Sequence, residues 1–250
     1  MRDDELADVL RATARAVGDA FRTGVEDYRA GGERDDQYAL DLVTDAVAVR
    51  LLSHAGLGVL SEESGRHHPE REVCVVVDPI DGSTNASRGI PWFATSLAAV
   101  DGEGVRAAVV VNQASGVCYE ATRGGGATKD GAPISVGPPT PLDRSLIAMN
   151  GYARRSFGWR QYRAFGAAAL DLCLVAEGAI EGYLDVAGSN LGVWDYLGGQ
   201  CILTEAGGCI ADAFDEPMVV LDHAARRSPV AASSPALLAE LVAARREMAS

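Results

Sequence analysis

The interpretation of this chain starts from one stretch, Asp78-Pro79-Ile80-Asp81-Gly82-Ser83-Thr84-Asn85. It follows the run Val75-Val76-Val77, which predicts a buried central strand that stops at Asp78. Two carboxylates therefore leave the end of a strand close together, with Pro79 forcing a turn between them, and hard divalent cations bind such sets of oxygen ligands. The backbone N–H groups after Asp81 open a short helix, where a phosphate binds without any lysine. A metal site beside an anion site indicates phosphoryl transfer.

Two acidic residues far from this stretch belong to the same argument. Glu62 follows a short apolar segment, residues 56–60, which predicts a buried strand. Asp195 follows Trp194 at the start of an apolar segment that predicts a helix. Taken singly, each has an ordinary structural explanation, because a lone Asp at a helix start is usually an N-cap and a Glu-Glu pair is usually a solvated turn.

Three blocks of the sequence resemble the signature blocks of the inositol monophosphatase family. They are Ser61-Glu62-Glu63-Ser64, residues 78–85, and residues 194–199 with residues 204–208. They occur in the family order and at near-family separations, and the resemblance covers essentially the whole chain. It implies an α/β (α+β layered) fold with alternating layers of helices and sheets, as in inositol monophosphatase and fructose-1,6-bisphosphatase. It also implies a Mg²⁺-dependent phosphomonoesterase that hydrolyses a small phosphorylated sugar or polyol, with inositol 1-phosphate and fructose 1,6-bisphosphate as candidate substrates.

The resemblance assigns roles to individual residues. The residues implied to hold two Mg²⁺ ions all offer oxygen: Glu62, Asp78, the carbonyl of Ile80, Asp81 and Asp195. The backbone amides of Gly82 and Ser83 are implied to bind phosphate, and the Ser83 hydroxyl to orient the attacking water. The amide of Thr84, at the same helix start, is a further candidate for phosphate binding. Two metal ions about 4 Å apart lower the pKa of bound water and stabilise the leaving alkoxide.

The carboxylate that serves the water and a third Mg²⁺ has two candidates. The family pattern Asp-x-Val-Thr-x-x-Asp, laid on Asp41-Leu42-Val43-Thr44, places Val47 where the carboxylate belongs. A shifted register instead places Asp41 at the functional position, which resembles archaeal members with combined inositol monophosphatase and fructose-1,6-bisphosphatase activity. We therefore favour Asp41, with Asp45 as the alternative. Two to three Mg²⁺ ions per active site are expected from the resemblance.

The substrate pocket has three candidate residues. Asp185 ends a predicted strand ten residues before Asp195, where family members place an acidic residue that hydrogen-bonds ligand hydroxyls. Arg163 and Gly166 are further candidates for the pocket wall, although a surface Arg and a small residue in helix packing give the same pattern. Enzymes that share the three blocks leave other functions open: a phosphatase of 3′-phosphoadenosine 5′-phosphate or of histidinol phosphate, or a weakly active regulatory relative.

The remaining pattern predicts two lobes. Residues 1–137 would form an N-terminal α+β lobe with the metal and phosphate site, and residues 138–250 a C-terminal α/β lobe that supplies Asp195 and the substrate pocket. The boundary is the proline-rich run at 137–141. Helices are predicted at 6–21, 41–54, 167–177, 195–206 and 235–246, and further strands at 94–100, 105–112, 117–122, 145–149, 179–186 and 208–211.

The composition limits which binding partners and which cellular compartment are expected. The chain has 250 residues and a net charge of −13, and such an acidic surface repels nucleic acid and anionic membranes. No apolar stretch approaches the roughly 20 residues that span a bilayer, and the acidic N-terminus lacks the apolar core of a signal peptide, so a cytoplasmic location is expected. The scattered cysteines indicate free thiols rather than a zinc site. Family members are often dimers, so a homodimer is expected by analogy.

Overall fold

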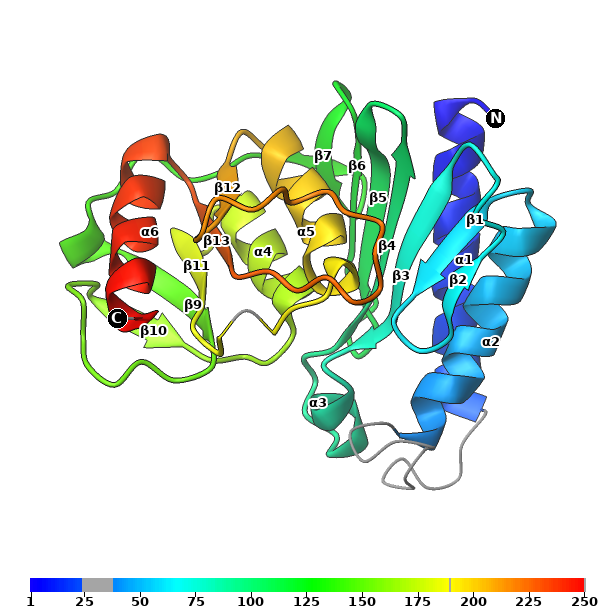
Figure 1. Cartoon of the computed structure of the whole chain (residues 1–250), viewed down its shortest axis with the longest axis horizontal. Helices are drawn as coiled ribbons and strands as arrows, with labels where there is room; N and C mark the ends of the chain where they lie inside the picture. The colour runs from blue at the N-terminus through cyan, green and yellow to red at the C-terminus, as the bar shows by residue number, and fades with distance from the viewer. Residues whose placement is uncertain (24–37, 189, 250) are drawn as a thin grey trace.

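The computed structural model describes residues 1–23, 38–188 and 190–249, and its helical and sheet layers alternate (Figure 1). One outer layer holds α1 (Asp3–Thr23) and α2 (Ala39–His54), and the opposite outer layer holds α6 (Pro235–Ala249). Between the two sheets lies a middle layer with α4 (Ala168–Ala176) and α5 (Val193–Glu205). The expected layered α/β fold is confirmed.

The larger sheet has eight strands in the order β2-β1-β3-β4-β5-β6-β7-β8. Their bounds are β1 (Gly58–Ser61), β2 (Gly65–His67), β3 (Cys74–Asp81), β4 (Ala94–Asp101), β5 (Gly104–Asn112), β6 (Cys118–Thr122), β7 (Gly126–Lys129) and β8 (Ala132–Ile134). Strand β1 is parallel to β3, and the other neighbours are antiparallel. The predicted meander from β4 to β6 is confirmed. Strands β2, β7 and β8 are missing from the sequence prediction, because they are too short to show an alternating pattern.

The smaller sheet has five strands in the order β10-β9-β11-β13-β12. Their bounds are β9 (Leu146–Asn150), β10 (Gln161–Arg163), β11 (Gly182–Asp185), β12 (Cys209–Asp212) and β13 (Pro229–Ala232). Strands β9, β10 and β11 are parallel, and β13 is antiparallel to both β11 and β12. The predicted strands that correspond to β9, β11 and β12 are confirmed, whereas the sequence pattern does not predict β10 or β13.

Strand β3 is covered on both faces, which fixes the end that carries the acidic residues. On one face, Val75 packs in a buried cluster with Leu6 and Val17 of α1. On the other face, Val76 packs in a second cluster with Leu197 of α5. All five of these side chains are at most 1% exposed. A strand buried on both faces reads as a continuous apolar run, as this one does.

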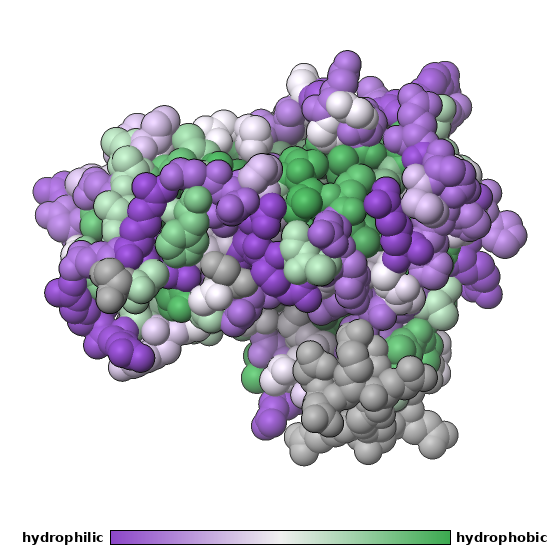
Figure 2. Space-filling view, viewed as in Figure 1, coloured by the Kyte–Doolittle hydropathy of each residue, from purple (hydrophilic) through white to green (hydrophobic). Residues whose placement is uncertain are grey.

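The two predicted lobes share a core. Val76 and Val110 of the larger sheet belong to the same buried cluster as Leu172 of α4 and Tyr183 of the smaller sheet. On the face shown in Figure 2, hydrophobic residues gather in the middle, where α5 meets the larger sheet, and hydrophilic residues surround them. The division at residues 137–138 separates the strands of the two sheets but not the core, and the division into two lobes stays a prediction.

Two simpler features follow from composition. The helices in the described part of the chain lack the length and apolar character that a membrane crossing requires. The five cysteines are free thiols, and Cys74, Cys173 and Cys201 are buried.

Strand β3 departs from its prediction in a way that shapes the site. The prediction that it stops at Asp78 is wrong, because it continues through Pro79 to Asp81. Its pairing with β4 shifts there, since Asp78 lies opposite Ser96 and Asp81 opposite Ala94, so three steps on β3 match two on β4. Side chains three apart on a regular strand point to opposite faces, and the extra residue of this β-bulge cancels that alternation. Asp78 and Asp81 therefore face the same side, and Pro79 occupies a bulge, where its missing N–H costs no ladder bond.

Candidate metal and phosphate site

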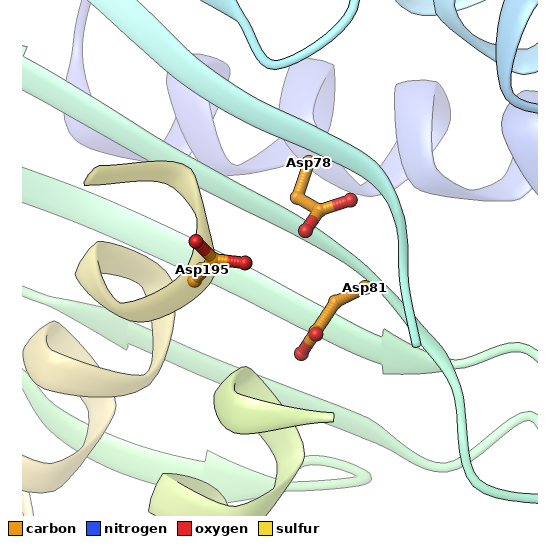
Figure 3. A group of neighbouring side chains, drawn as sticks. All are labelled: Asp78, Asp81 and Asp195. Atoms are coloured by element: carbon orange, nitrogen blue, oxygen red, sulfur yellow. The ribbon is translucent and has the colours of Figure 1, made fainter. Parts of the chain in front are cut away.

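Three carboxylates from distant parts of the chain meet at the end of β3 (Figure 3). Asp78 and Asp81 come from the bulged end of the strand and Asp195 from the first turn of α5, and one carboxylate oxygen of each lies within 4.8 Å of the others. Asp78 and Asp81 are only 1% and 6% exposed, while Asp195 keeps part of its surface open to solvent. The structure thus brings these three predicted ligands together, and metal binding by them stays a prediction.

Glu62 joins this cluster from the neighbouring strand. Because β1 is parallel to β3, the carboxyl ends of both strands lie at the same edge of the sheet. The Glu62 N–H donates to the carbonyl of Val77 at 3.1 Å, which holds the residue beside the start of the bulge. Its charge contributes to the raised pKa of Asp78.

The four carboxyl groups repel one another when no cation is bound. The pKa of each is raised well above its usual range, in every case first because burial disfavours the charged form. Repulsion adds to this effect, from Asp195 on Glu62, from Glu62 on Asp78, and from Asp81 on Asp195. Such a cluster of buried like charges is unfavourable for folding unless a cation compensates it.

Asp195 is held by the start of its helix. Gly192 is the N-cap of α5, and Asp195 lies three positions later, where its Oδ2 accepts the Gly192 N–H at 2.6 Å. The explanation of Asp195 as the N-cap itself is therefore wrong, although its carboxylate does satisfy an amide of the first turn. Its second oxygen accepts no hydrogen bond from the described residues and is left for another partner.

Asp81 links the strand end to the middle helical layer. Its carboxylate accepts the N–H groups of Ala168 at 3.2 Å and Ala169 at 2.7 Å, the first amides of α4. These groups have no acceptor within their own helix, and the helix N-terminus favours a negative charge. Asp81 therefore has a structural role in addition to its proposed role as a ligand.

The donor set suits a hard divalent cation. The side chains that meet here offer carboxylate oxygens, and no His or Cys belongs to this group within the described residues. Oδ1 of Asp78 is buried and has no hydrogen-bond partner among the described residues, so an anionic oxygen is left for a cation to satisfy. Oxygen-only sites favour Mg²⁺, Ca²⁺ or Mn²⁺ over zinc. Ile80, whose carbonyl is the remaining predicted ligand, lies in the bulge between the two aspartates.

Comparison with known proteins identifies the family of this chain. The sequence matches the Inositol monophosphatase family over residues 3–250. The chain belongs to the inositol monophosphatase family. The family is metal-dependent, and membership supports a phosphatase of this type.

The relatives of this family member include proteins named as phosphatases and a protein named as a Nus factor. The fructose-1,6-bisphosphatase/inositol-1-monophosphatase of Archaeoglobus fulgidus is 31% identical over 223 residues, which cover 84% of this chain and 87% of that protein. The Nus factor SuhB of Escherichia coli is 29% identical over 198 residues, which cover 72% and 73%. The structure of inositol monophosphatase from Anabaena has a TM-score of 0.81 at 25% identity, and the match covers 98% of this chain and 96% of that one.

The predicted phosphate-binding turn of this family member leads into α3 (Ser83–Ser87). Gly82 precedes the helix in the left-handed conformation, with φ +86. Asn85 fastens the turn to the second half of the chain, because its Nδ2 donates to the carbonyls of Trp92 at 2.8 Å and Phe165 at 2.7 Å. The rings of Trp92 and Phe165 also contact each other, with centroids 5.1 Å apart. The turn is therefore held from both sides before any ligand binds.

Gly82→Ala is expected to destabilise this turn by about 2 kcal/mol or more. A Cβ there would lie 2.9 Å from the Gly166 carbonyl oxygen and 3.1 Å from that of Trp92, and the left-handed φ disfavours any side chain. Chemical denaturation and inorganic phosphate binding would both report the change. Gly89→Ala is the matched control, since Gly89 has φ +70 but no atom within 4 Å of the added Cβ. Equal losses in the two variants would contradict the clash.

The two candidates for the water-serving carboxylate lie in different surroundings. Asp41 is 3% exposed and occupies the third position of α2, where its Oδ2 accepts the Tyr38 N–H at 2.9 Å. Its charge contributes to the raised pKa of Glu62. Asp45 instead accepts a short hydrogen bond from the Ser61 hydroxyl, which ties α2 to β1. The structure thus gives Asp45 a structural partner and places the charge of Asp41 near the cluster.

Two other predicted pocket residues, Arg163 and Asp185, differ in their exposure and in their hydrogen bonds. Arg163 is exposed on the edge strand β10 and donates to Tyr162 and Gln161. Asp185 is 0% exposed, and its carboxylate accepts hydrogen bonds from three groups: Asn150 Nδ2, Ala187 N–H and Ser228 Oγ. A direct contact of either residue with a substrate stays a prediction.

A buried carboxyl group near the site is missing from the sequence prediction. Asp171 is 1% exposed in α4 and accepts a hydrogen bond from Trp92 Nε1 at 2.9 Å. Burial raises its pKa to about 8, against the effect of this hydrogen bond, and its charge contributes to the raised pKa of Asp81. An Asp in an apolar helix is a signal for a buried polar contact, but its partner is 79 residues away in the sequence.

Asp171→Asn is expected to remove a pH dependence of stability while keeping an oxygen acceptor for Trp92. The ordinary pKa of an Asp is about 3.9, and the folded value is higher, so the folded state holds the extra proton between these values. The wild type should therefore lose stability relative to the variant as pH rises from about 4 to about 8, by a few kcal/mol, and not further above that. Urea denaturation of both proteins across this range measures the difference. A difference that is constant with pH would contradict the buried protonated state.

Proposed function

We propose that this family member is a Mg²⁺-dependent phosphomonoesterase that hydrolyses a small sugar or polyol phosphate. The first candidate substrates are inositol 1-phosphate and fructose 1,6-bisphosphate, which the name of the Archaeoglobus fulgidus relative suggests. The observation that carries the proposal is the meeting of Asp78, Asp81 and Asp195 beside the turn that starts at Gly82. An oxygen-rich cation site next to a set of N–H groups is what phosphoryl transfer requires.

The residues that would hold Mg²⁺ are the oxygen donors of the strand ends and of α5: Glu62, Asp78, the carbonyl of Ile80, Asp81 and Asp195. When bound there, Mg²⁺ would lower the pKa of a coordinated water and neutralise charge on the phosphate. The support is the orphaned Oδ1 of Asp78 and the repulsion that raises the pKa values of these side chains. Whether two or three ions bind depends on Asp41.

The protein's own residues would bind and orient the reacting groups. The N–H groups of Gly82, Ser83 and Thr84 are proposed to hold the phosphate, because the first amides of a helix have no acceptor in the chain. The Ser83 hydroxyl is proposed to orient the attacking water, and Asp41 to accept its proton. Water then forms the new bond to phosphorus while the bond from phosphorus to the sugar oxygen breaks. The sugar oxygen takes up a proton from solvent, so inorganic phosphate and the alcohol are released.

The substrate wall is proposed to include Gly166, Arg163 and Asp185. Gly166 has the most direct support, since its carbonyl oxygen lies beside Gly82 of the phosphate turn. Arg163 has an exposed position from which to meet an anionic substrate. Asp185 has the least support as a wall residue, because the chain already supplies hydrogen bonds to both of its carboxylate oxygens.

A phosphate-release screen tests the proposal. The purified chain should release phosphate from inositol 1-phosphate or fructose 1,6-bisphosphate with Mg²⁺ and lose that activity in excess EDTA. Activity restricted to 3′-phosphoadenosine 5′-phosphate or histidinol phosphate would replace the substrate class and keep the reaction. Full activity in EDTA would contradict the mechanism. Mg²⁺ binding without hydrolysis of any substrate would favour a regulatory role.

A further inference from the structure

The long connection between β12 and β13, residues 213–228, contacts the backbone of Glu62 and the residue before Asp195. In Figure 1 it runs from the smaller sheet across α5 to the neighbourhood of the larger sheet. The Met218 carbonyl accepts the Tyr196 hydroxyl of α5 at 2.7 Å, and the Leu221 carbonyl accepts Arg66 of β2 at 3.4 Å. The segment therefore contacts both halves of the chain.

Its two ends are fixed by a single side chain. The Asp212 carboxylate accepts the N–H of Phe214 at 2.8 Å through Oδ1 and the N–H of Ser228 at 2.7 Å through Oδ2. Arg227 adds a backbone hydrogen bond to Leu191, at 2.9 Å. The segment is thus anchored at its base and at its contacts with both halves.

One residue of the segment, His223, contacts both the backbone of Glu62 and the residue before Asp195. His223 Nε2 lies 2.8 Å from the backbone carbonyl oxygen of Glu62. Because a carbonyl can only accept, Nε2 carries the hydrogen in this contact. The same imidazole packs against the ring of Trp194, the residue before Asp195, with ring centroids 4.7 Å apart. One side chain thus connects the Glu62 turn, from the first half of the chain, to the start of α5, from the second.

The other groups near this side chain keep it in place. The Arg226 guanidinium lies over the Trp194 ring at 5.1 Å from its centroid, and it also donates to the carbonyl of His223 at 2.8 Å. Its positive charge lowers the pKa of Asp195, against the dominant effect of burial. The indole is therefore packed by residues of this segment, which limits the positions that the start of α5 can take.

This connection matters because the groups that it brings together repel each other. Glu62 and Asp195 belong to different elements, and no direct hydrogen bond joins the two residues in the described part of the chain. We infer that His223 is a positioning residue that fixes the turn carrying Glu62 relative to the start of α5, which carries Asp195. The inference rests on the proposed function, since it assigns His223 a role toward the proposed Mg²⁺ site. In this role His223 acts through the backbone of Glu62 and the ring of Trp194, and it is not proposed as a metal ligand.

The test compares His223→Phe, which keeps a ring for Trp194 but removes the donor, with His223→Gln, which restores a donating N–H. Calorimetric titration of the full chain with Mg²⁺ alone gives the affinity, and melting in EDTA reports folding. Partners that orient metal ligands typically contribute about 10- to 100-fold in affinity. We therefore expect His223→Phe to bind Mg²⁺ about 10-fold more weakly than the wild type, and His223→Gln to recover most of the lost affinity. The kcat at saturating Mg²⁺ should change much less than the Mg²⁺ requirement. His54→Phe, at an exposed histidine near the end of α2, is the matched control.

The outcomes separate this inference from the proposed function. Wild-type binding and hydrolysis together with an unchanged Mg²⁺ affinity in a folded His223→Phe protein overturn the inference alone. The same holds if Gln and Phe weaken binding equally, because the donated hydrogen bond then has no part in it. A wild-type chain that neither binds Mg²⁺ nor releases phosphate overturns the proposed function and the inference with it.

Discussion

Asp78→Asn is expected to lower the kcat of phosphate release by about three orders of magnitude. In the same protein, measured in EDTA at pH 8, it should raise the melting temperature by about 5 °C. Asn has nearly the shape of Asp but no charge, so the substitution removes a proposed metal ligand. It also removes a negative charge that is 1% exposed and repelled by Glu62 and Asp81. The same charge is thus expected to be essential for activity and unfavourable for the metal-free fold.

Two further variants test whether the combination of lost activity and higher metal-free stability is specific to Asp78. Asp81→Asn should also abolish activity but should not stabilise, because the Asp81 carboxylate accepts two amides of α4 and an Asn oxygen with its NH₂ group cannot replace both. Asp143→Asn, at an exposed position, makes the same chemical change outside the site and should alter neither property. A catalytically competent Asp78→Asn, or one that melts well below the wild type in EDTA, would contradict the cluster as described.

The bulge in β3 explains why the sequence locates these residues but not their geometry. The sequence places Asp78 and Asp81 after a β-branched run, and the structure has them there. Regular alternation would put them on opposite faces, so a strand that ends at Asp78 is the natural prediction from sequence. What brings them together is one unpaired residue, which depends on the register with β4 and is visible only when both strands are in place.

The residues that the sequence does not identify are those whose partners are distant. The three acidic blocks carry local patterns, α1 carries an apolar stripe, and α5 is a continuous apolar segment, so each can be predicted from the sequence. His223 has no such pattern, because its significance comes from a contact with Glu62, which lies 161 residues away. The contact of Trp92 with Asp171 has the same origin. The short strands β2, β10 and β13 likewise take their structure from neighbours rather than from their own composition.

The metal-free protein is expected to become less stable as pH rises from about 5 to about 8, and Mg²⁺ is expected to reverse that loss. Unfolded Asp and Glu have pKa values of about 4, whereas the four carboxyl groups of the site have raised values in the fold. Between these values the folded state holds more protons than the unfolded state, so the free energy of unfolding falls with increasing pH. A bound cation compensates the charges and removes the penalty. The gain in melting temperature on adding Mg²⁺ should therefore increase with pH, from nearly nothing at pH 5 to several degrees at pH 8.

The negative net charge of the whole chain also predicts that stability falls as pH rises. The experiment has to separate this general effect from the effect of the site carboxylates. A net charge of −13 at pH 7 repels itself less as pH falls, which also stabilises the fold at lower pH. High concentrations of a monovalent salt screen that exposed charge but leave buried carboxylates largely unscreened. At high salt, the difference between the melting temperatures in Mg²⁺ and in EDTA should therefore still increase with pH in the wild type. We call this difference the gap. The gap should shrink in Asp78→Asn, where one of the repelling groups is gone, and a gap of equal size in both proteins would place the effect outside the site.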